Sequence, residues 1–314
     1  MARSLQLAVT VACLALLWQL ADGERALRYL AAANPLWMAA ALAALTLQTV
    51  FSALRWRLTA QRLGIVLDRR EALGEYYLSQ LVNQLLPGGV LGDAGRAIRA
   101  RAQAGLLASG QAVLFERLAG QIALFLVFAA GLAGTLAVPG GFEVPPWLLP
   151  PLALALLTAP GLWLLWERAP SDPRPGHVSP FPARALPAAA AFVGAFLRAV
   201  ASPGVRGRQF ALSLGTALCN IAAFACCAAA VGLMLAPPAA QVLVPLILFS
   251  MLIPVTLSGW GLREGTAAAL LPLAGATGPE ALAASVAFGL AFLVASLPGV
   301  LSLALAAAPD ALEP

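Results

Sequence analysis

Lysine is absent from this sequence, histidine occurs once, and charged residues fill only 11% of the 314 positions. A soluble domain has roughly 25% charged residues, so this chain carries less than half of the charge that a soluble surface needs. The shortage argues against a soluble enzyme, a nucleic-acid-binding module and a disordered chain. Without lysine, the Gly-Lys-Ser/Thr ending of a nucleotide-binding Walker loop cannot form, and ATP-driven pumping is unsupported.

Cysteine is scarce as well. Its four copies, Cys13, Cys219, Cys226 and Cys227, lie within apolar runs, and their spacing does not match that of metal ligands. The only histidine, His177, lies in a polar, proline-rich stretch, so no Ser-His-Asp triad is indicated. We interpret the cysteines as small packing residues. The sequence therefore predicts no metal site, no cofactor, no catalytic residue and no enzyme.

Apolar residues, by contrast, are abundant. They make up 61% of the chain, and the mean hydropathy is +0.86, which is typical of a polytopic membrane protein. We predict a single domain over 1–314, an all-α integral membrane bundle with about 6–8 transmembrane helices. The first apolar segment suits a signal-anchor better than a cleaved signal peptide, because more spans follow. The apolar segments are 5–21, 36–54, 112–138, 147–166, 210–235, 241–257 and 281–308.

Glycine and proline interrupt two apolar stretches, and arginine lies close to both breaks. The first break lies within 76–101 and the second within 254–273. Backbone groups freed from helical pairing are costly in hydrocarbon unless they line a cavity or contact protein. We therefore predict two re-entrant or broken elements, of the kind that transporters with internal repeats place around a substrate site. Their central residues are Pro87, Gly88, Gly89 and Gly92 in the first, and Ser258, Gly259, Trp260 and Gly261 in the second.

All 19 basic residues are arginine, and their distribution predicts the topology. With a cytoplasmic N-terminus and a re-entrant 76–101, the cytoplasmic side holds fifteen arginines and the opposite side only Arg25 and Arg28. This split agrees with the positive-inside rule. The cytoplasmic side then includes a charged loop over 55–75, which opens with an interfacial Arg-Trp-Arg anchor, and a long loop over 167–208.

Asp93 and Arg96 directly follow the first break. If a helix covers 93–110, the Asp93 carboxylate caps its N-terminus, and Arg96 lies almost one turn further, on a neighbouring face. One interpretation is a polar cavity in which freed backbone amides and Arg96 hold an anionic headgroup. The other is a structural cap, with Arg96 and Arg99 only anchoring the helix at the interface.

Glu116 and Arg117 lie in the first turns of a predicted span. Ionisable groups at such a depth are expensive, and they are either functional or tightly paired. We predict that Glu116 pairs with Arg96 or Arg263 and that Arg117 pairs with Asp93. If the two residues lie at the interface instead, neither pairing is needed.

Arg263 and Glu264 follow the second break. Neighbours on a helix point about 100° apart, so we expect each to pair with another element, in a substrate site or as a buried structural ion pair. Asn83 and Gln84 precede the first break and suit hydrogen bonds to freed backbone or polar helix packing, whereas Tyr76 is expected on a solvated face. The candidate substrate-binding set is Asn83, Gly88, Gly89, Gly92, Asp93, Arg96, Glu116, Arg117, Ser258, Gly259, Gly261, Arg263 and Glu264.

These motifs occur in an order that resembles the flippase-like transmembrane domain of the lysylphosphatidylglycerol synthase/flippase family. The resemblance covers about 45–310 and depends on the ordered set, since each motif alone is weak. The set comprises Arg55-Trp56-Arg57, Asn83-x-x-Leu86-Pro87-Gly88-Gly89, Gly92-Asp93-x-x-Arg96, Glu116-Arg117-Leu118, Pro254 and Ser258-Gly259-Trp260-Gly261-Leu262-Arg263-Glu264-Gly265.

The resemblance implies a multi-pass protein of the bacterial inner membrane that moves, or helps to move, an anionic or amino-acid-modified lipid. Members are often fused to a cytosolic aminoacyl-transferase; we expect none here, so synthesis of an aminoacyl-lipid is not expected. Membrane lipids are the expected partners, with a lipid-modifying enzyme as a further one. Two alternatives stay open: an accessory membrane subunit of a lipid- or glycolipid-modifying enzyme, and a secondary transporter for a small anion.

Overall fold

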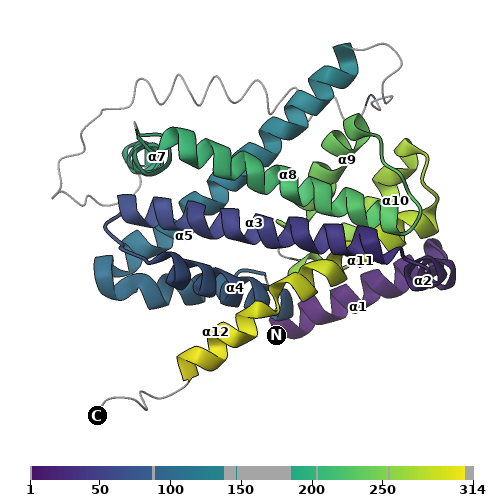
Figure 1. Ribbon diagram of the computed structural model, residues 1–314, viewed down its shortest axis with the longest axis horizontal. Coiled ribbons are helices and arrows are strands. Elements are labelled where there is room, and N and C mark those ends of the chain that lie inside the picture. Colours follow the sequence, from purple (N-terminus) through teal and green to yellow (C-terminus); the bar gives the residue numbers. More distant parts are fainter. Residues whose placement is uncertain are drawn as a thin grey trace.

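The computed structural model describes residues 2–86, 89–137, 146, 185–202, 204–253 and 255–307. Over these ranges the regular elements are helical and there is no strand (Figure 1). The prediction of an all-α polytopic bundle is therefore confirmed. Some sequence predictions fall outside the described residues, namely those for Pro87, Gly88, the span 147–166, the loop from 167 to 184 with His177, and Pro254.

The chain begins with two helices at a sharp angle. α1 (Ala2–Leu20) and α2 (Gly23–Ala31) meet at an angle of 89°. Asp22 stands at the bend with a left-handed backbone (φ 50°), and its carboxylate accepts a hydrogen bond from the amide of Arg25 (3.1 Å). This cap starts α2 in its new direction, and α2 then packs against α11 (Gly278–Ser296).

α3 (Pro35–Arg62) and α8 (Arg206–Ala230) form the centre of the bundle and lie side by side along their lengths (Figure 1). Asn34 caps α3 through the amide of Leu36 (2.9 Å). Close contact with α8 depends on Gly215, because a Cβ at that position would lie 2.9 Å from the ring of Phe51. These two helices form one wall of the cavity described below.

The predicted interfacial anchor at Arg55-Trp56-Arg57 is wrong. α3 continues through it to Arg62, and Arg55 and Trp56 are only 3% and 1% exposed. Arg55 can leave water because a carboxylate inside the bundle neutralises it. The predicted charged loop over 55–75 shrinks to 63–68, because the capping box of Asp68 and Glu71 starts the next helix at once.

The first break joins α4 (Arg69–Leu85) to α5 (Leu91–Ala137). A straight helix would separate Arg96 from Glu116 by about 30 Å, yet their side chains are 2.9 Å apart. The chain therefore turns back at Gly105, whose backbone (φ 80°, ψ 166°) is one that glycine adopts readily. We call 91–104 the first arm of α5 and 106–137 its second arm.

The helix after the first break starts two residues earlier than predicted, at Leu91. Asp93 therefore lies inside the first turn, and the prediction that it is the N-cap is wrong. The carboxylate is still close to the positive end of the helix dipole, but its hydrogen bonds go to side chains instead of to its own backbone.

Short helices surround the second break. α9 (Pro237–Ser250) has 14 residues, fewer than the roughly 20 that cross a bilayer, so the segment predicted as a span at 241–257 is not among the candidate membrane spans. A single 3-10 turn, η2 (Leu257–Gly259), is followed by α10 (Leu262–Leu270) and a second turn, η3 (Leu271–Ala274). The remaining elements are α7 (Ala185–Val200) and α12 (Pro298–Ala307).

Within the described ranges, four helices are long and apolar enough to cross a membrane. They are α3, α5, α8, and α11 together with the start of α12, and the bent pair of α1 and α2 makes a fifth candidate. The chain is therefore a multi-pass membrane protein. Its main cluster of buried apolar residues joins α2, α3, the second arm of α5, α8, α9, α10 and α11, and the two breaks lie beside this core.

Candidate functional site

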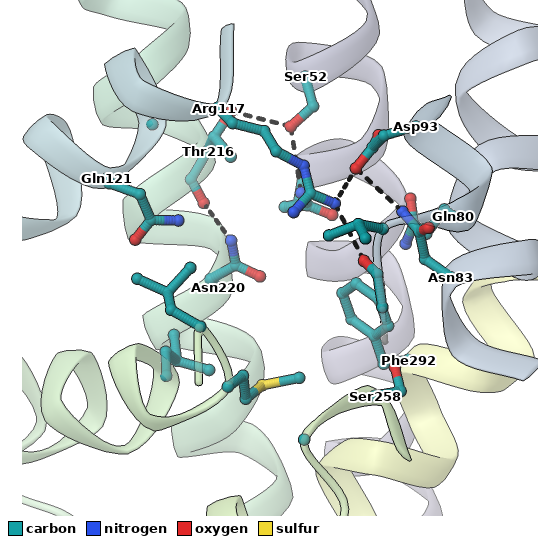
Figure 2. A pocket seen from close by; sticks show the side chains of 18 of the residues that line it. Ser52, Gln80, Asn83, Asp93, Arg117, Gln121, Thr216, Asn220, Ser258 and Phe292 are labelled. Carbon is teal, nitrogen blue, oxygen red and sulfur yellow. Dashed lines mark hydrogen bonds and ion pairs between the residues drawn. The ribbon is translucent and has the colours of Figure 1, made fainter. Parts of the chain in front are cut away.

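A cavity of about 500 Å³ lies between α3, α4, α5, α8 and α11, and both breaks contribute to its wall. Figure 2 shows its polar lining, with Arg117 beside Asp93 and Ser258 across from them. Of the predicted set, the cavity brings together Asn83, Gly89, Asp93, Glu116, Arg117, Ser258 and Gly259. Gly92, Arg96, Gly261, Arg263 and Glu264 do not line it.

A cluster of buried charges stands at one end of the cavity. The Glu116 carboxylate accepts hydrogen bonds from Nε of Arg55 (3.1 Å) and Nη2 of Arg96 (2.9 Å). Nε of Arg96 also donates to Asp93 (2.9 Å), and Asp93 forms an ion pair with Arg117. These contacts confirm the predicted pairings of Glu116 with Arg96 and of Arg117 with Asp93, whereas the alternative partner, Arg263, lies elsewhere.

Burial makes this cluster unusual for charged groups. Arg96 and Glu116 are 1% and 0% exposed, and buried charges are tolerated only when they are paired and hydrogen-bonded. The Arg96 guanidinium also lies between the rings of Trp56 and Tyr76, at 4.8 and 4.6 Å from their centres, where cation–π attraction adds to the pairing. Three guanidiniums face two carboxylates, so the cluster carries one net positive charge.

Arg117 is the member of the cluster that a ligand can reach. Its side chain is 38% exposed, against 4% for Arg55 and 1% for Arg96. It lines the cavity, and its Nη2 donates to the carbonyl oxygen of Gly89 in the first break (3.4 Å). The geometry therefore gives Arg117, instead of Arg96, the position for meeting an anionic group.

The Asn83 side chain connects α4 to the start of α5 across the first break. Its carbonyl oxygen accepts from the amide of Gly92 (2.7 Å), and its amide group donates to Asp93 (3.2 Å). Ser79 donates to the other oxygen of Asp93 (3.0 Å). Asn83 thus supplies an acceptor for a freed backbone amide and orients the carboxylate that pairs with Arg117. The predicted hydrogen bond of Asn83 to freed backbone is confirmed.

Gly92→Ala is expected to destabilise the protein by about 1–3 kcal/mol, because overpacking forces backbone to shift. A Cβ at this position would lie 2.0 Å from the carbonyl oxygen of Ser79, so α4 and the first arm of α5 would have to separate. The measurement is the melting temperature in detergent. Gly110→Ala in the second arm is the matched control, since nothing lies within 4 Å of its Cβ position; equal melting temperatures would contradict the close approach.

The second break holds its own ion pair. Arg263 and Glu264 are fully buried and pair with each other, with Nη2 of Arg263 2.5 Å from Oε1 of Glu264, so the prediction that each pairs with another element is wrong. The pairing is possible because Gly289 leaves room for the guanidinium to fold back; a Cβ there would lie 2.2 Å from it. Ser285 donates to Glu264 (3.2 Å), and Glu264 accepts from the amide of Gly261 (2.7 Å).

A hydrogen bond joins the two breaks directly. The Ser258 hydroxyl donates to the side-chain oxygen of Gln84 (3.3 Å), the last polar residue of α4. Ser258 reaches it from a left-handed backbone (φ 50°), which is strained for a residue with a Cβ. The second break is therefore tied to the end of α4, beside the first break.

Sequence reasoning missed Arg55 and Tyr76. The structure places both on the cavity wall, and the Tyr76 hydroxyl donates to Glu116 (3.3 Å), so the expectation of a solvated face for Tyr76 is wrong. A signal was present for Arg55. It shares a helix face with polar residues at spacings of three and four, and that face is buried along α3: Gln48, Ser52, Arg55 and Thr59.

Within the part of the chain that the structure describes, no group of three or more His, Cys, Asp or Glu side chains is arranged to hold a metal ion. A sequence profile described as the lysylphosphatidylglycerol synthase TM region matches residues 4–299. No curated protein matches the chain in sequence. The matched region includes both breaks, the charged cluster and the cavity between them.

Proposed function

The chain belongs to the family of the lysylphosphatidylglycerol synthase TM region, and from this premise we propose that it translocates an anionic or modified phospholipid, or a lipid-linked headgroup, across the bacterial inner membrane. The family places the protein in a membrane-lipid context, and the matched region is the membrane part of the synthase. We propose a cytoplasmic N-terminus, because that orientation puts most of the arginines on the cytoplasmic side.

The observation that carries this proposal is the cavity with its net positive cluster. A headgroup that crosses the bilayer needs a polar path, and an intramembrane arginine supplies one where it lines a cavity. Arg117 lines this cavity with an exposed guanidinium, and guanidinium–phosphate hydrogen bonds are among the strong ones. The headgroup enters the cavity and meets Arg117, while the acyl chains stay in the surrounding lipid.

The hairpin of α4 and the first arm of α5 supports a re-entrant element over 76–101. α4 leads to the first break, the first arm leads away from it, and Gly105 then turns the chain into the long second arm. Such a hairpin enters and leaves on one side of the membrane, and it places the backbone groups of the first break, which lack helical partners, at the cavity. Interrupted helices of this kind bind substrate in other transporters.

Arg117→Ala is expected to slow lipid translocation by about ten- to a hundredfold, since a hydrogen bond to a charged group contributes about 1.5–3 kcal/mol. The assay reconstitutes the purified chain in phosphatidylcholine vesicles with a trace of tail-labelled phosphatidylglycerol. Exchange between leaflets is followed by quenching the outer label with a reductant that does not cross the bilayer.

The matched control is Arg99→Ala. Arg99 pairs with Glu75 at the surface, with a side chain that is 44% exposed, and such pairs contribute little, so this variant should translocate at the wild-type rate. If the wild-type chain does not accelerate lipid exchange, the proposed function is overturned. Equal exchange rates for Arg117→Ala and Arg99→Ala would overturn only the role of Arg117. A small-anion transporter would instead accelerate phosphate efflux and leave lipid exchange unchanged.

A further inference from the structure

Uncharged polar side chains outnumber charged ones in the wall of the cavity. Six amide side chains line it, together with five aliphatic hydroxyls. They come from α3, α4, α5, α8 and the second break, so they surround the space instead of covering one face. The amides are Gln48, Gln80, Asn83, Gln84, Gln121 and Asn220, and the hydroxyls are Ser52, Ser79, Thr216, Thr256 and Ser258. Figure 2 shows Gln121 and Asn220 on one side of the cavity and Gln80 on the other.

Several polar atoms of this wall have no partner within the described part of the chain. The amide nitrogen of Gln80, the hydroxyl of Thr256 and Nη1 of Arg55 are all buried and unpaired there. Gln80, Thr256 and Arg55 are 7%, 1% and 3% exposed, and all three line the cavity. Buried polar groups are normally hydrogen-bonded, so these atoms are placed for a polar ligand.

The carboxylates of the cavity are already engaged. Asp93 is bound by Arg96 and Arg117, and Glu116 by Arg55 and Arg96. A cationic headgroup would therefore meet a net positive cluster and no unpaired carboxylate among the lining residues. An anionic group would meet the exposed guanidinium of Arg117.

We propose that the headgroup is anionic and polyhydroxylated, such as a glycerol, inositol or sugar joined through one phosphate, and that it is not a cationic aminoacyl headgroup. This inference deepens the proposed function and depends on it. Amide side chains both donate and accept, which matches the hydroxyls of a polyol. A space of about 500 Å³ is in the range of small-molecule pockets. The phosphate pairs with Arg117, and the hydroxyls engage Gln80 and Thr256.

The test compares lipids that differ only in the headgroup. Phosphatidylglycerol and phosphatidylpropanol carry the same charge, but the second lacks hydroxyls, and lysyl-phosphatidylglycerol is cationic. In the vesicle assay we expect phosphatidylglycerol to exchange at least about tenfold faster than either, because a site built to bind hydroxyls rejects analogues that lack them. Phosphatidylinositol should exchange as fast as phosphatidylglycerol or faster.

Gln80→Leu should reduce the preference for phosphatidylglycerol over phosphatidylpropanol without slowing phosphatidylpropanol. Thr256→Val, which keeps the shape of the side chain, gives an independent second test if the first variant does not fold. Gln19→Leu, at an exposed position on α1, is the matched control and should keep the wild-type preference.

The possible failures are distinct. Equal rates for phosphatidylglycerol and phosphatidylpropanol would overturn the polyol preference and leave the proposed function intact. Fastest exchange of lysyl-phosphatidylglycerol would overturn the anionic assignment. A wild-type chain that accelerates none of the four lipids would overturn the proposed function and, with it, this inference.

Discussion

Glu116→Ala should lower the free energy of unfolding by about 3–5 kcal/mol, because removing one partner leaves buried charges uncompensated. The carboxylate is 0% exposed, and it binds both Arg55 and Arg96. Arg55 would lose its only carboxylate contact within the described residues, and Arg96 would keep only Asp93. The measurement is unfolding in mixed micelles, followed by tryptophan fluorescence, since Trp56 lies against the Arg96 guanidinium.

Glu75→Ala is the matched control for this substitution. Glu75 pairs with Arg99, but both side chains are partly exposed, so its removal should cost less than about 1 kcal/mol. A combined Arg55→Met, Arg96→Met and Glu116→Leu variant should regain much of the lost stability, because well-packed apolar residues can replace a buried ion cluster. Equal midpoints for Glu116→Ala and Glu75→Ala would contradict the structural role of the cluster.

Glu264→Ala should cause a loss of similar size, about 3–5 kcal/mol by the same reasoning. Arg263 would remain fully buried beside Ser285, and the amide of Gly261 would lose its acceptor. The readout is again the unfolding midpoint in mixed micelles. The loss of stability should be the same with or without a lipid bound in the cavity, because neither Arg263 nor Glu264 lines the cavity.

The double variant Arg263→Met with Glu264→Gln separates stability from transport. The glutamine keeps an acceptor for Gly261, and the methionine removes the charge, so stability should largely return. Transport should then return with it, since neither residue lines the cavity. A double variant that folds but does not move lipid would show that this ion pair takes part in translocation.

Composition was enough to predict the class of the fold. A chain with 11% charged and 61% hydrophobic residues cannot cover its apolar surface in water, but it can form a helical bundle in a membrane. Local motifs also located both breaks, predicted the pairing of Arg117 with Asp93, and gave Arg96 as one of two partners for Glu116. The partner of Arg55 could not be predicted in this way. Its carboxylate lies 61 residues further along the chain, and only the turn at Gly105 brings it back.

The error at Arg263 has a different origin. Helical geometry separates neighbouring side chains, and that rule holds for short ones, but a long arginine can fold back where space exists. The space comes from Gly289 on another helix, which no local pattern around Arg263 reveals. Likewise, the Arg-Trp-Arg segment has the composition of an interfacial anchor, and only its distant carboxylate makes burial possible.

The turn at Gly105 also has a consequence for biosynthesis. Arg55 leaves the ribosome 61 residues before Glu116, so α3 is made with a cation whose carboxylate does not yet exist. A helix with an unpaired arginine is costly at membrane depth, so we expect α3 to reach its final depth only after the second arm of α5 has been synthesised. On this expectation, the segment from 35 to 137 completes its insertion as one unit.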